Sequence, residues 1–336
     1  MKKISMLLLI ALALMFTACG QSSQVPTQTS APAETQPPAP ASTHTSPPPT
    51  ATAAPTDTAT PEVAHLSAQI VFVSNRGEDP NVTGLYLLDP ETLTVTPLDS
   101  GFEAVVLPAW SADGTRIAFA VPDVWNLYSI QPDSTNLTQI TDFRSNNPDW
   151  SPDGSRLVFQ SDHQNEPENT PDIYLIDADG TNLVEILDDP EKIDYNPRWS
   201  PDGSRILFLS SRTGNMEIFT IDPDGSNPVQ VTDSKNPVSG AAWSPDGEKI
   251  VFVYGAGTAT DLYVIHKDGA LDSVIRLTAD ASSESSPSWS PDGERIVFSS
   301  DSSGNWDLWM VKADGSGEAE QLTNDEYYDA FPDWGP

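Results

Sequence analysis

Six tryptophans recur along the chain at nearly constant spacing, and this feature limits the possible folds more than any other. The intervals between them are 40, 49, 44, 46 and 45 residues. A period near 45 residues, with several strand-like segments in each repeat, is typical of a β-propeller in which every repeat forms one blade. The tryptophans are Trp110, Trp150, Trp199, Trp243, Trp289 and Trp334.

Five of the six repeats carry the same turn, and all six carry the same strand signals. Five of the tryptophans open a W-S-P-D-G or W-S-A-D-G sequence, such as 199–203. In this turn Pro presets the first corner, and Gly takes the left-handed position that closes a hairpin. Two apolar segments follow in every repeat, so the sequence predicts six blades. The first kind covers 70–74, 117–121, 157–161, 206–210, 250–254 and 296–300, and the second covers 85–89, 127–131, 173–177, 218–222, 262–266 and 308–312.

The two ends of the repeat array predict how the ring closes. The first copy, over 70–98, lacks a W-S-P-D-G strand of its own, whereas 331–336 is a first strand with no repeat after it. We therefore expect residues 329–336 to complete the first blade beside 70–74, which leaves only short free edges. The predicted fold is all-β: a six-bladed propeller of four-stranded antiparallel blades, closed by the C-terminal strand.

The first 66 residues have the pattern of an export signal followed by a linker. Two lysines precede an apolar run over 7–16 that is too short to span a bilayer. The sequence F-T-A-C at 16–19 resembles a lipoprotein processing site, so Cys19, the only cysteine, is the expected lipidation site. An ordinary secretory signal with an unrelated cysteine is the alternative. We expect a signal peptide over 1–18, the lipidated Cys19 with a disordered Pro/Thr/Ala/Ser-rich linker over 19–66, and the propeller over 67–336.

The repeat resembles that of a known family. Its consensus, P-x-W-S-P-D-G-x-x-I-x-F-x-S with a later I-Y-x-x-D-x-D-G-x-N, resembles the WD40-like repeat of the TolB propeller family over residues 67–336. TolB itself has an α/β domain before its propeller, where this chain has the linker. Peptidases that share the repeat carry a hydrolase domain with a G-x-S-x-G elbow, and this sequence contains no such motif. The resemblance therefore implies the fold more strongly than a function.

Charge and residue types argue against several kinds of ligand and chemistry. The formal net charge of −33 argues against nucleic acid or anionic lipid as the ligand. The four histidines have no metal-ligand spacing, so we predict no catalytic residue and no metal ligand. The acidic turns at 177–182 and 222–227 have their Gly at the wrong position for an EF-hand calcium loop and lack its terminal Glu. Turn geometry explains these aspartates; calcium is the alternative, and no other cofactor is expected.

The irregular loops are the expected partner-binding region. In a four-stranded meander, the short turns lie on one face of the ring, and the second-to-third-strand loops and the passages between blades lie on the other. The latter vary from blade to blade, as expected of the surface that carries specificity. Tyrosines among acids there suit recognition of a basic or polyhydroxylated partner, and packing at the core edge is the alternative. The candidate partner-binding residues are Tyr195, Asp194, Tyr327, Tyr328 and Asp329.

Three functions remain open on the sequence alone. The favoured hypothesis is a lipid-anchored, non-catalytic protein-binding or scaffold propeller, displayed on a stalk at the extracytoplasmic face of the cell envelope. The alternatives are an envelope-assembly factor like TolB, and a propeller enzyme, a lyase or hydrolase acting on an extracellular glycan or peptide. We expect a monomer that contacts the membrane only through its N-terminal lipid and binds a protein or an extracellular glycan. The six tryptophans are expected to pack between blades.

Overall fold

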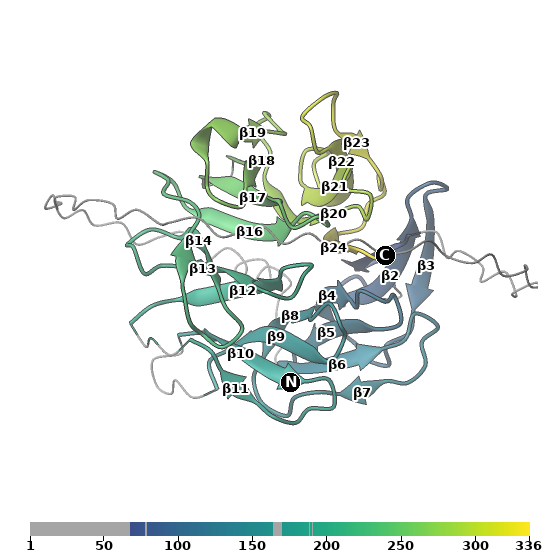
Figure 1. Cartoon of the computed structure of the whole chain (residues 1–336). Coiled ribbons are helices and arrows are strands. Elements are labelled where there is room, and N and C mark those ends of the chain that lie inside the picture. The colour runs from purple at the N-terminus through teal and green to yellow at the C-terminus, as the bar shows by residue number, and fades with distance from the viewer. Residues whose placement is uncertain (1–67, 78, 164–169, 188, 190, 258) are drawn as a thin grey trace, which may run out of the picture. The chain divides into compact units, whose positions relative to one another are not determined.

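The computed structural model describes residues 68–336 except 78, 164–169, 188, 190 and 258. Six four-stranded antiparallel sheets lie around a common centre (Figure 1). The predicted signal peptide, Cys19 and the linker lie outside the described residues. No helix within the described part of the chain is long and apolar enough to cross a membrane.

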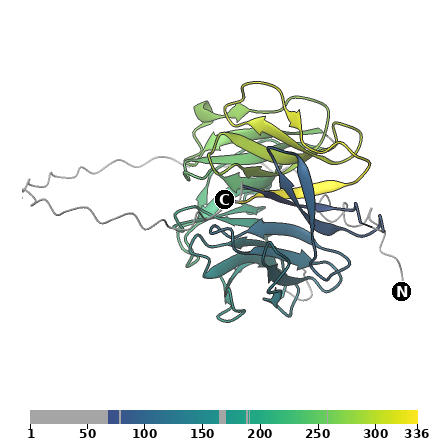
Figure 2. The ribbon, with the colours of Figure 1, turned by 90° about the vertical axis from the view of Figure 1, so that its right-hand side faces the viewer.

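The first blade combines both ends of the repeat array, as predicted. Strand β24 (Asp329–Trp334) pairs with β1 (Ile70–Ser74), so that Trp334 lies opposite Ile70 and Asp329 opposite Ser74. The sheet continues through β2 (Gly84–Asp89) to β3 (Thr94–Leu98). In Figure 2 the yellow C-terminal strand lies beside the dark blue N-terminal strands. The ring is therefore closed by backbone hydrogen bonds between the first and last strands.

The other five blades follow the chain from the innermost to the outermost strand. Blade two is β4 (Val106–Trp110), β5 (Ile117–Val121), β6 (Asn126–Ile130) and β7 (Thr138–Gln139). Blade three is β8 (Asn146–Trp150), β9 (Arg156–Ser161), β10 (Asp172–Asp177) and β11 (Val184–Glu185). Blade four is β12 (Asp194–Trp199), β13 (Ile206–Ser210), β14 (Glu217–Ile221) and β15 (Val229–Gln230).

Blades five and six complete the ring. Blade five is β16 (Val238–Trp243), β17 (Lys249–Ala256), β18 (Ala259–His266) and β19 (Ile275–Arg276), with the short 3-10 helix η1 (Leu271–Ser273) before β19. Blade six is β20 (Glu284–Trp289), β21 (Arg295–Ser300), β22 (Asp307–Lys312) and β23 (Glu320–Gln321). All twelve predicted apolar segments are strands, with ends within three residues of the predicted ones.

One hairpin differs from the sequence expectation. The predicted strands 250–254 and 262–266 leave a loop between them that includes 255–260, but β17 and β18 extend into this segment, and Gly255 pairs with Thr260. A Cβ atom on Gly255 would lie only 2.5 Å from the carbonyl oxygen of Ala259. Because glycine has no side chain, the two strands can approach closely here and continue beyond the length of their counterparts.

The hydrophobic core is divided among the six seams between neighbouring blades. Each seam holds one buried cluster, and each cluster contains one of the repeat tryptophans. At the seam of blades three and four, for example, Trp199 packs with Ile173 from one blade and Phe208 from the other. Every middle strand is apolar on both faces because each blade packs against two others. The indoles therefore join neighbouring blades.

Candidate functional site

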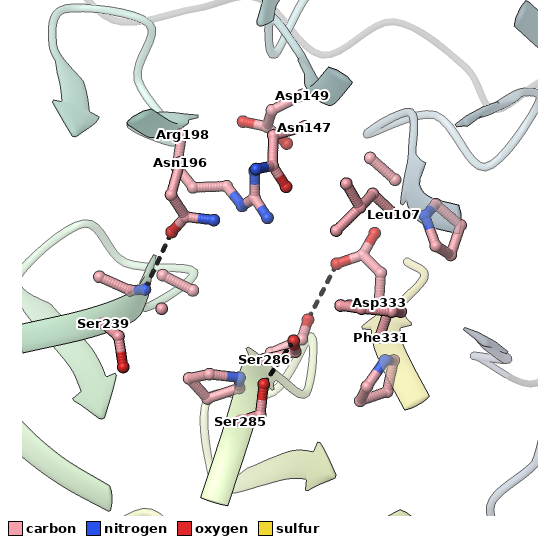
Figure 3. A pocket seen from close by; sticks show the side chains of 18 of the residues that line it. Leu107, Asn147, Asp149, Asn196, Arg198, Ser239, Ser285, Ser286, Phe331 and Asp333 are labelled. Atoms are coloured by element: carbon pink, nitrogen blue, oxygen red, sulfur yellow. Dashed lines mark hydrogen bonds between the residues drawn. The ribbon is translucent and has the colours of Figure 1, made fainter. Parts of the chain in front are cut away.

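A cavity of about 900 Å³ occupies the centre of the ring. Its walls come mainly from the six inner strands β4, β8, β12, β16, β20 and β24. Figure 3 shows side chains from several of these strands converging on this space. A cavity of this size at the symmetry centre of a propeller is a candidate ligand site.

A β-bulge interrupts every inner strand at the same place, three residues before its tryptophan. The register of each inner strand with its neighbour shifts at this point. The residue at the bulge has φ between 51° and 55° in all six strands, although only one of the six is glycine. A left-handed conformation costs an ordinary residue about 1–2 kcal/mol. All six residues line the cavity: Leu107, Asn147, Asn196, Gly240, Ser286 and Phe331.

The bulge residues make the cavity wall chemically uneven. Asn147 and Asn196 bring carboxamides to one side of the lumen, whereas Leu107 and Phe331 bring apolar side chains to the other (Figure 3). The Asn196 side-chain oxygen accepts a 3.1 Å hydrogen bond from the Ala241 N–H of blade five. These bulge residues were not among the residues predicted from the sequence. Aligning the inner strands on their tryptophans would have shown it.

A second set of residues lies immediately before each tryptophan. Two of its members, Asp149 and Asp333, each accept a 2.7 Å hydrogen bond from the backbone N–H of a tryptophan in the next blade. The donors are Trp199 for Asp149 and Trp110 for Asp333. Ser288 extends the pattern, because its hydroxyl oxygen accepts a 3.0 Å bond from the Trp334 N–H and its hydroxyl donates to Asp333. These carboxylates therefore link blades as well as lining the cavity.

Burial raises the pKa of both of these carboxylates. Burial raises the pKa of Asp149 to about 6, although the positive charge of Arg198 and the Trp199 N–H oppose the rise. Burial also raises the pKa of Asp333, again against the effect of the Trp110 N–H and of Arg198. Arg198 thus stabilises negative charge on both.

Arg198 occupies the same position in blade four and has few partners. Its Nη1 donates to the Pro197 carbonyl at 2.9 Å, and no other hydrogen bond or ion pair to its guanidinium occurs within the described chain. Figure 3 shows the guanidinium in the lumen, on the same side as the Asn147 side chain. The Asn147 side-chain nitrogen donates to Gln160 at 2.9 Å, whereas its oxygen is buried without a hydrogen-bond partner. Donors of Arg198 and an acceptor of Asn147 are thus left without partners among the described residues that line the cavity.

The structure places two of the sequence-predicted residues on the cavity wall. Tyr195 and Tyr328 line the cavity, and burial raises the pKa of both phenols. They lie toward its end on the loop face, the face that carries the second-to-third-strand loops and the passages between blades. Tyr327 lies nearby, with its ring centre 5.6 Å from the Arg76 guanidinium carbon.

The two predicted aspartates are buried in ion pairs. The Arg212 guanidinium lies 3.1 Å from Asp194 in blade four, and the Arg76 guanidinium lies 2.5 Å from Asp329 in blade one. Both carboxylates are fully shielded from solvent. Asp194 and Asp329 therefore hold the first residues of their inner strands in place beside Tyr195 and Tyr328.

The aspartates of the short turns bind their own turns. Asp202 accepts a 2.6 Å bond from the Ser200 hydroxyl and a 3.0 Å bond from the Ser204 N–H. The Ser200 hydroxyl is the main cause that lowers the pKa of Asp202 to about 2. In the other kind of turn, Asp179 accepts bonds from the N–H and hydroxyl of Thr181. These bonds account for Asp in both turns on conformational grounds.

One group of three carboxylates lies elsewhere in the described residues. Oxygen atoms of Asp307, Asp325 and Asp329 lie within 4.8 Å of one another. Arg76 forms ion pairs with Asp325 and Asp329 and so already provides a cation at this place.

Comparison with known proteins assigns the fold to a family. The family model described as the TolB beta propeller domain matches residues 60–257 and 229–336. The chain belongs to the TolB beta propeller family. It is 30% identical over 98 residues to the Tol-Pal system protein TolB of Alcanivorax borkumensis, which corresponds to 28% of this chain and 23% of that protein.

Solved structures extend the similarity of this TolB-type propeller to most of the chain. TolB from Acinetobacter baumannii has a TM-score of 0.69 at 22% identity, covering 80% of this chain and 67% of its own. The putative TolB from Agrobacterium tumefaciens has a TM-score of 0.62 at 20% identity, covering 80% of this chain and 99% of its own. At this identity the similarity shows the shared fold, and function must be argued from the site.

Proposed function

We propose that this chain is a non-catalytic protein-binding propeller of the cell envelope, which holds a peptide segment of its partner in the central cavity. One observation carries the proposal. Arg198 has Nε and Nη2 donors without a partner in the described structure, and the oxygen of Asn147 is buried without a donor. A buried polar group without a partner is costly, so a ligand that bonds to both would be favoured.

A peptide segment fits this set of free groups. A peptide carbonyl can accept from Arg198, and a peptide N–H can donate to the Asn147 oxygen. Leu107 and Phe331, which line the other side of the cavity together with Asp333, offer apolar contacts to a side chain of the same segment. Tyr195 and Tyr328, which line the cavity toward the loop face, would contact the segment where it enters.

Two features support binding over catalysis. Asp149 and Asp333 have raised pKa values, as a catalytic acid would, but each also accepts a backbone N–H of the next blade. Moving a proton on either carboxylate would disturb the seam that it joins. The name of the Alcanivorax relative, a Tol-Pal system protein, is consistent with a role in an envelope assembly. Lipidation at Cys19 and the linker over 19–66 would tether the propeller at the extracytoplasmic face.

Affinity capture with the full chain from native envelopes tests this proposal. We expect Arg198→Gln to reduce recovery of the partner on the order of tenfold, because a hydrogen bond to a charged group contributes about 1.5–3 kcal/mol. Glu294→Gln, on the opposite face of the ring, is the matched control and should leave recovery unchanged. Equal recovery of the same partner by wild type and folded Arg198→Gln, measured by quantitative mass spectrometry, would exclude the cavity as the binding site.

A further inference from the structure

Three blades begin their inner strand with a carboxylate, and in two of them the chain provides its own cation. These are the pairs of Asp194 with Arg212 in blade four and of Asp329 with Arg76 in blade one. Each arginine stands two residues after the serine that lies opposite the carboxylate in the sheet, Ser210 or Ser74. Its Nε donates to that serine hydroxyl, at 2.7 Å for Arg212 and 2.9 Å for Arg76.

Both arginines also lie over a pair of aromatic rings from the middle strands. The Arg212 guanidinium carbon is 4.9 Å and 5.0 Å from the ring centres of Phe208 and Phe219. The Arg76 carbon is 5.3 Å and 5.5 Å from those of Phe72 and Tyr86. Serine, carboxylate and aromatic pair thus form one site for a guanidinium, and the fold uses it twice.

Blade six has the same arrangement without the arginine. Glu284 begins the inner strand, Ser300 lies opposite it, and Phe298 and Trp309 form the cross-strand aromatic pair. The residue two after Ser300 is Ser302, and its N–H donates to the Ser300 hydroxyl oxygen at 3.2 Å, as the N–H groups of both arginines do at 3.3 Å in their own blades. The three blades therefore share this backbone bond to the serine, and in blade six a serine stands where the other two have arginine.

Glu284 has no cation in contact with it in the described residues. It is 4% exposed, and its Oε1 accepts bonds from Ser282 at 2.7 Å and Ser300 at 3.2 Å. Its Oε2 is buried without a hydrogen-bond partner. Burial raises the pKa of Glu284 to about 7, and the nearby charges of Asp280 and Asp261 add to the rise.

The neighbouring groups do not supply the missing charge. Arg276, in the neighbouring blade five, forms an ion pair with Asp261 at 2.7 Å. Glu284 lines the central cavity together with Thr260 and Ser285. Glu284 is the first residue of β20, and β20 starts on the loop face. The Glu284 carboxylate therefore lies toward the loop-face end of the cavity, where we propose that the partner enters.

We propose that Glu284 binds an arginine side chain of the partner, which takes the position that Arg76 and Arg212 occupy in blades one and four. The inference rests on the proposed function, since it assumes a partner segment in the cavity. It adds a specific chemical requirement, namely a guanidinium near the inserted segment. The planar guanidinium can bond to the carboxylate and to Ser300 at once, as the internal arginines do. The acidic surroundings favour its approach.

An NMR titration of the full chain tests the inference without knowledge of the partner. The probe is N-acetyl-arginine methylamide at about pH 8, where the raised pKa of Glu284 leaves the carboxylate mostly ionised. The neutral probe N-acetyl-citrulline methylamide has nearly the same shape. We expect saturable shifts of the Glu284 and Thr260 backbone amide signals with the arginine probe and none with the citrulline probe.

Two variants test whether the probe binds at Glu284 or at acidic residues elsewhere on the surface. Ser302→Arg would place an arginine beside Glu284, as Arg76 and Arg212 lie beside their carboxylates in blades one and four. It should therefore abolish the saturable shifts and raise the melting temperature. Glu284→Gln should also weaken probe binding at least about tenfold. Glu294→Gln should not change it. Equal shifts with both probes, or full binding by folded Ser302→Arg, would overturn the inference, even if Glu284→Gln failed to fold.

The result of this titration can be distinguished from the result of the capture experiment that tests the proposed function. If Arg198→Gln loses the partner but the arginine probe does not bind at Glu284, the cavity binds a partner and the guanidinium requirement is wrong. If the probe binds at Glu284 and Arg198→Gln keeps the partner, the guanidinium site exists and the proposed use of the cavity is wrong.

Discussion

Equivalent positions of the six inner strands carry side chains with different tasks. Immediately before the tryptophan, Asp149 accepts a hydrogen bond from the next blade, whereas Arg198 leaves most of its donors free. At the first position of the strand, Asp194 has an internal cation and Glu284 has none. The repeat therefore fixes where a side chain lies, and the residue type at that place decides whether it joins blades or remains available to a ligand.

Because Glu284 has no cation partner among the described residues, its raised pKa should make the stability of the folded chain depend on pH. Its pKa is raised from 4.5 to about 7 in the folded chain, so folding favours the protonated form. This contribution to stability is complete below about pH 4.5 and is lost as the pH rises through about 7, by about 3 kcal/mol at most. We expect the melting temperature to fall between about pH 6 and pH 8 in wild type.

Two variants assign this pH effect. Glu284→Gln cannot titrate and should flatten the profile between about pH 6 and pH 8. Asp149→Asn should leave that range unchanged, because the pKa of Asp149 is raised only to about 6. A profile that falls as steeply in Glu284→Gln as in wild type would assign the effect to another group.

At the scale of elements, the two kinds of tight turn differ in what surrounds them. In the first-to-second-strand turn, a Cβ on Gly203 would meet Pro152 at an ordinary 3.7 Å. In the third-to-fourth-strand turn, a Cβ on Gly225 would lie 2.6 Å from the carbonyl oxygen of Ile186 in the preceding blade. Both glycines are left-handed, with φ of 69° and 80°. Only the second turn therefore also needs glycine for contact between blades.

Alanine at these two glycines should separate the two requirements. Gly203→Ala should cost about 1–2 kcal/mol, which is the cost of the left-handed conformation. Gly225→Ala should cost about 1–3 kcal/mol more, because the backbone of blade three must also move. Chemical denaturation of both variants measures the difference. Equal losses would show that the turn of blade four does not depend on its neighbour.

The sequence predicted the elements that depend on local interactions and missed those that depend on contacts between distant segments. Strand positions and the short turns depend on local pattern, so the repeats alone predicted all twelve middle strands. The extended hairpin at Gly255 depends on contact across the two strands, and a single glycine in the sequence did not reveal it. The site was harder still. Tyr195 and Tyr328 were selected as loop residues, whereas Arg198 and Glu284 emerged only when neighbouring blades were in place.

At the scale of the whole molecule, stability should depend on the last strand. Trp334 is buried at the seam of blades six and one, with Phe72 and Leu308 in the same cluster. Trp334→Ala should cost about 3–5 kcal/mol, and deletion of residues 329–336 should lower the melting temperature further, because it also removes the pairing with β1. Trp334→Phe, which keeps an aromatic ring, should lose less. An unchanged thermal melt after the deletion would refute closure by β24.

The closure also dictates an order of events during synthesis. β1 is made early and pairs with β24, whose residues 329–334 are added more than two hundred residues later. Until then blade one has only three strands, and the seam to blade six lacks its tryptophan. Bringing together segments so distant in the chain is slow compared with forming a hairpin. An unfinished chain therefore keeps an exposed strand edge, by which proteases and chaperones can distinguish it from a finished ring.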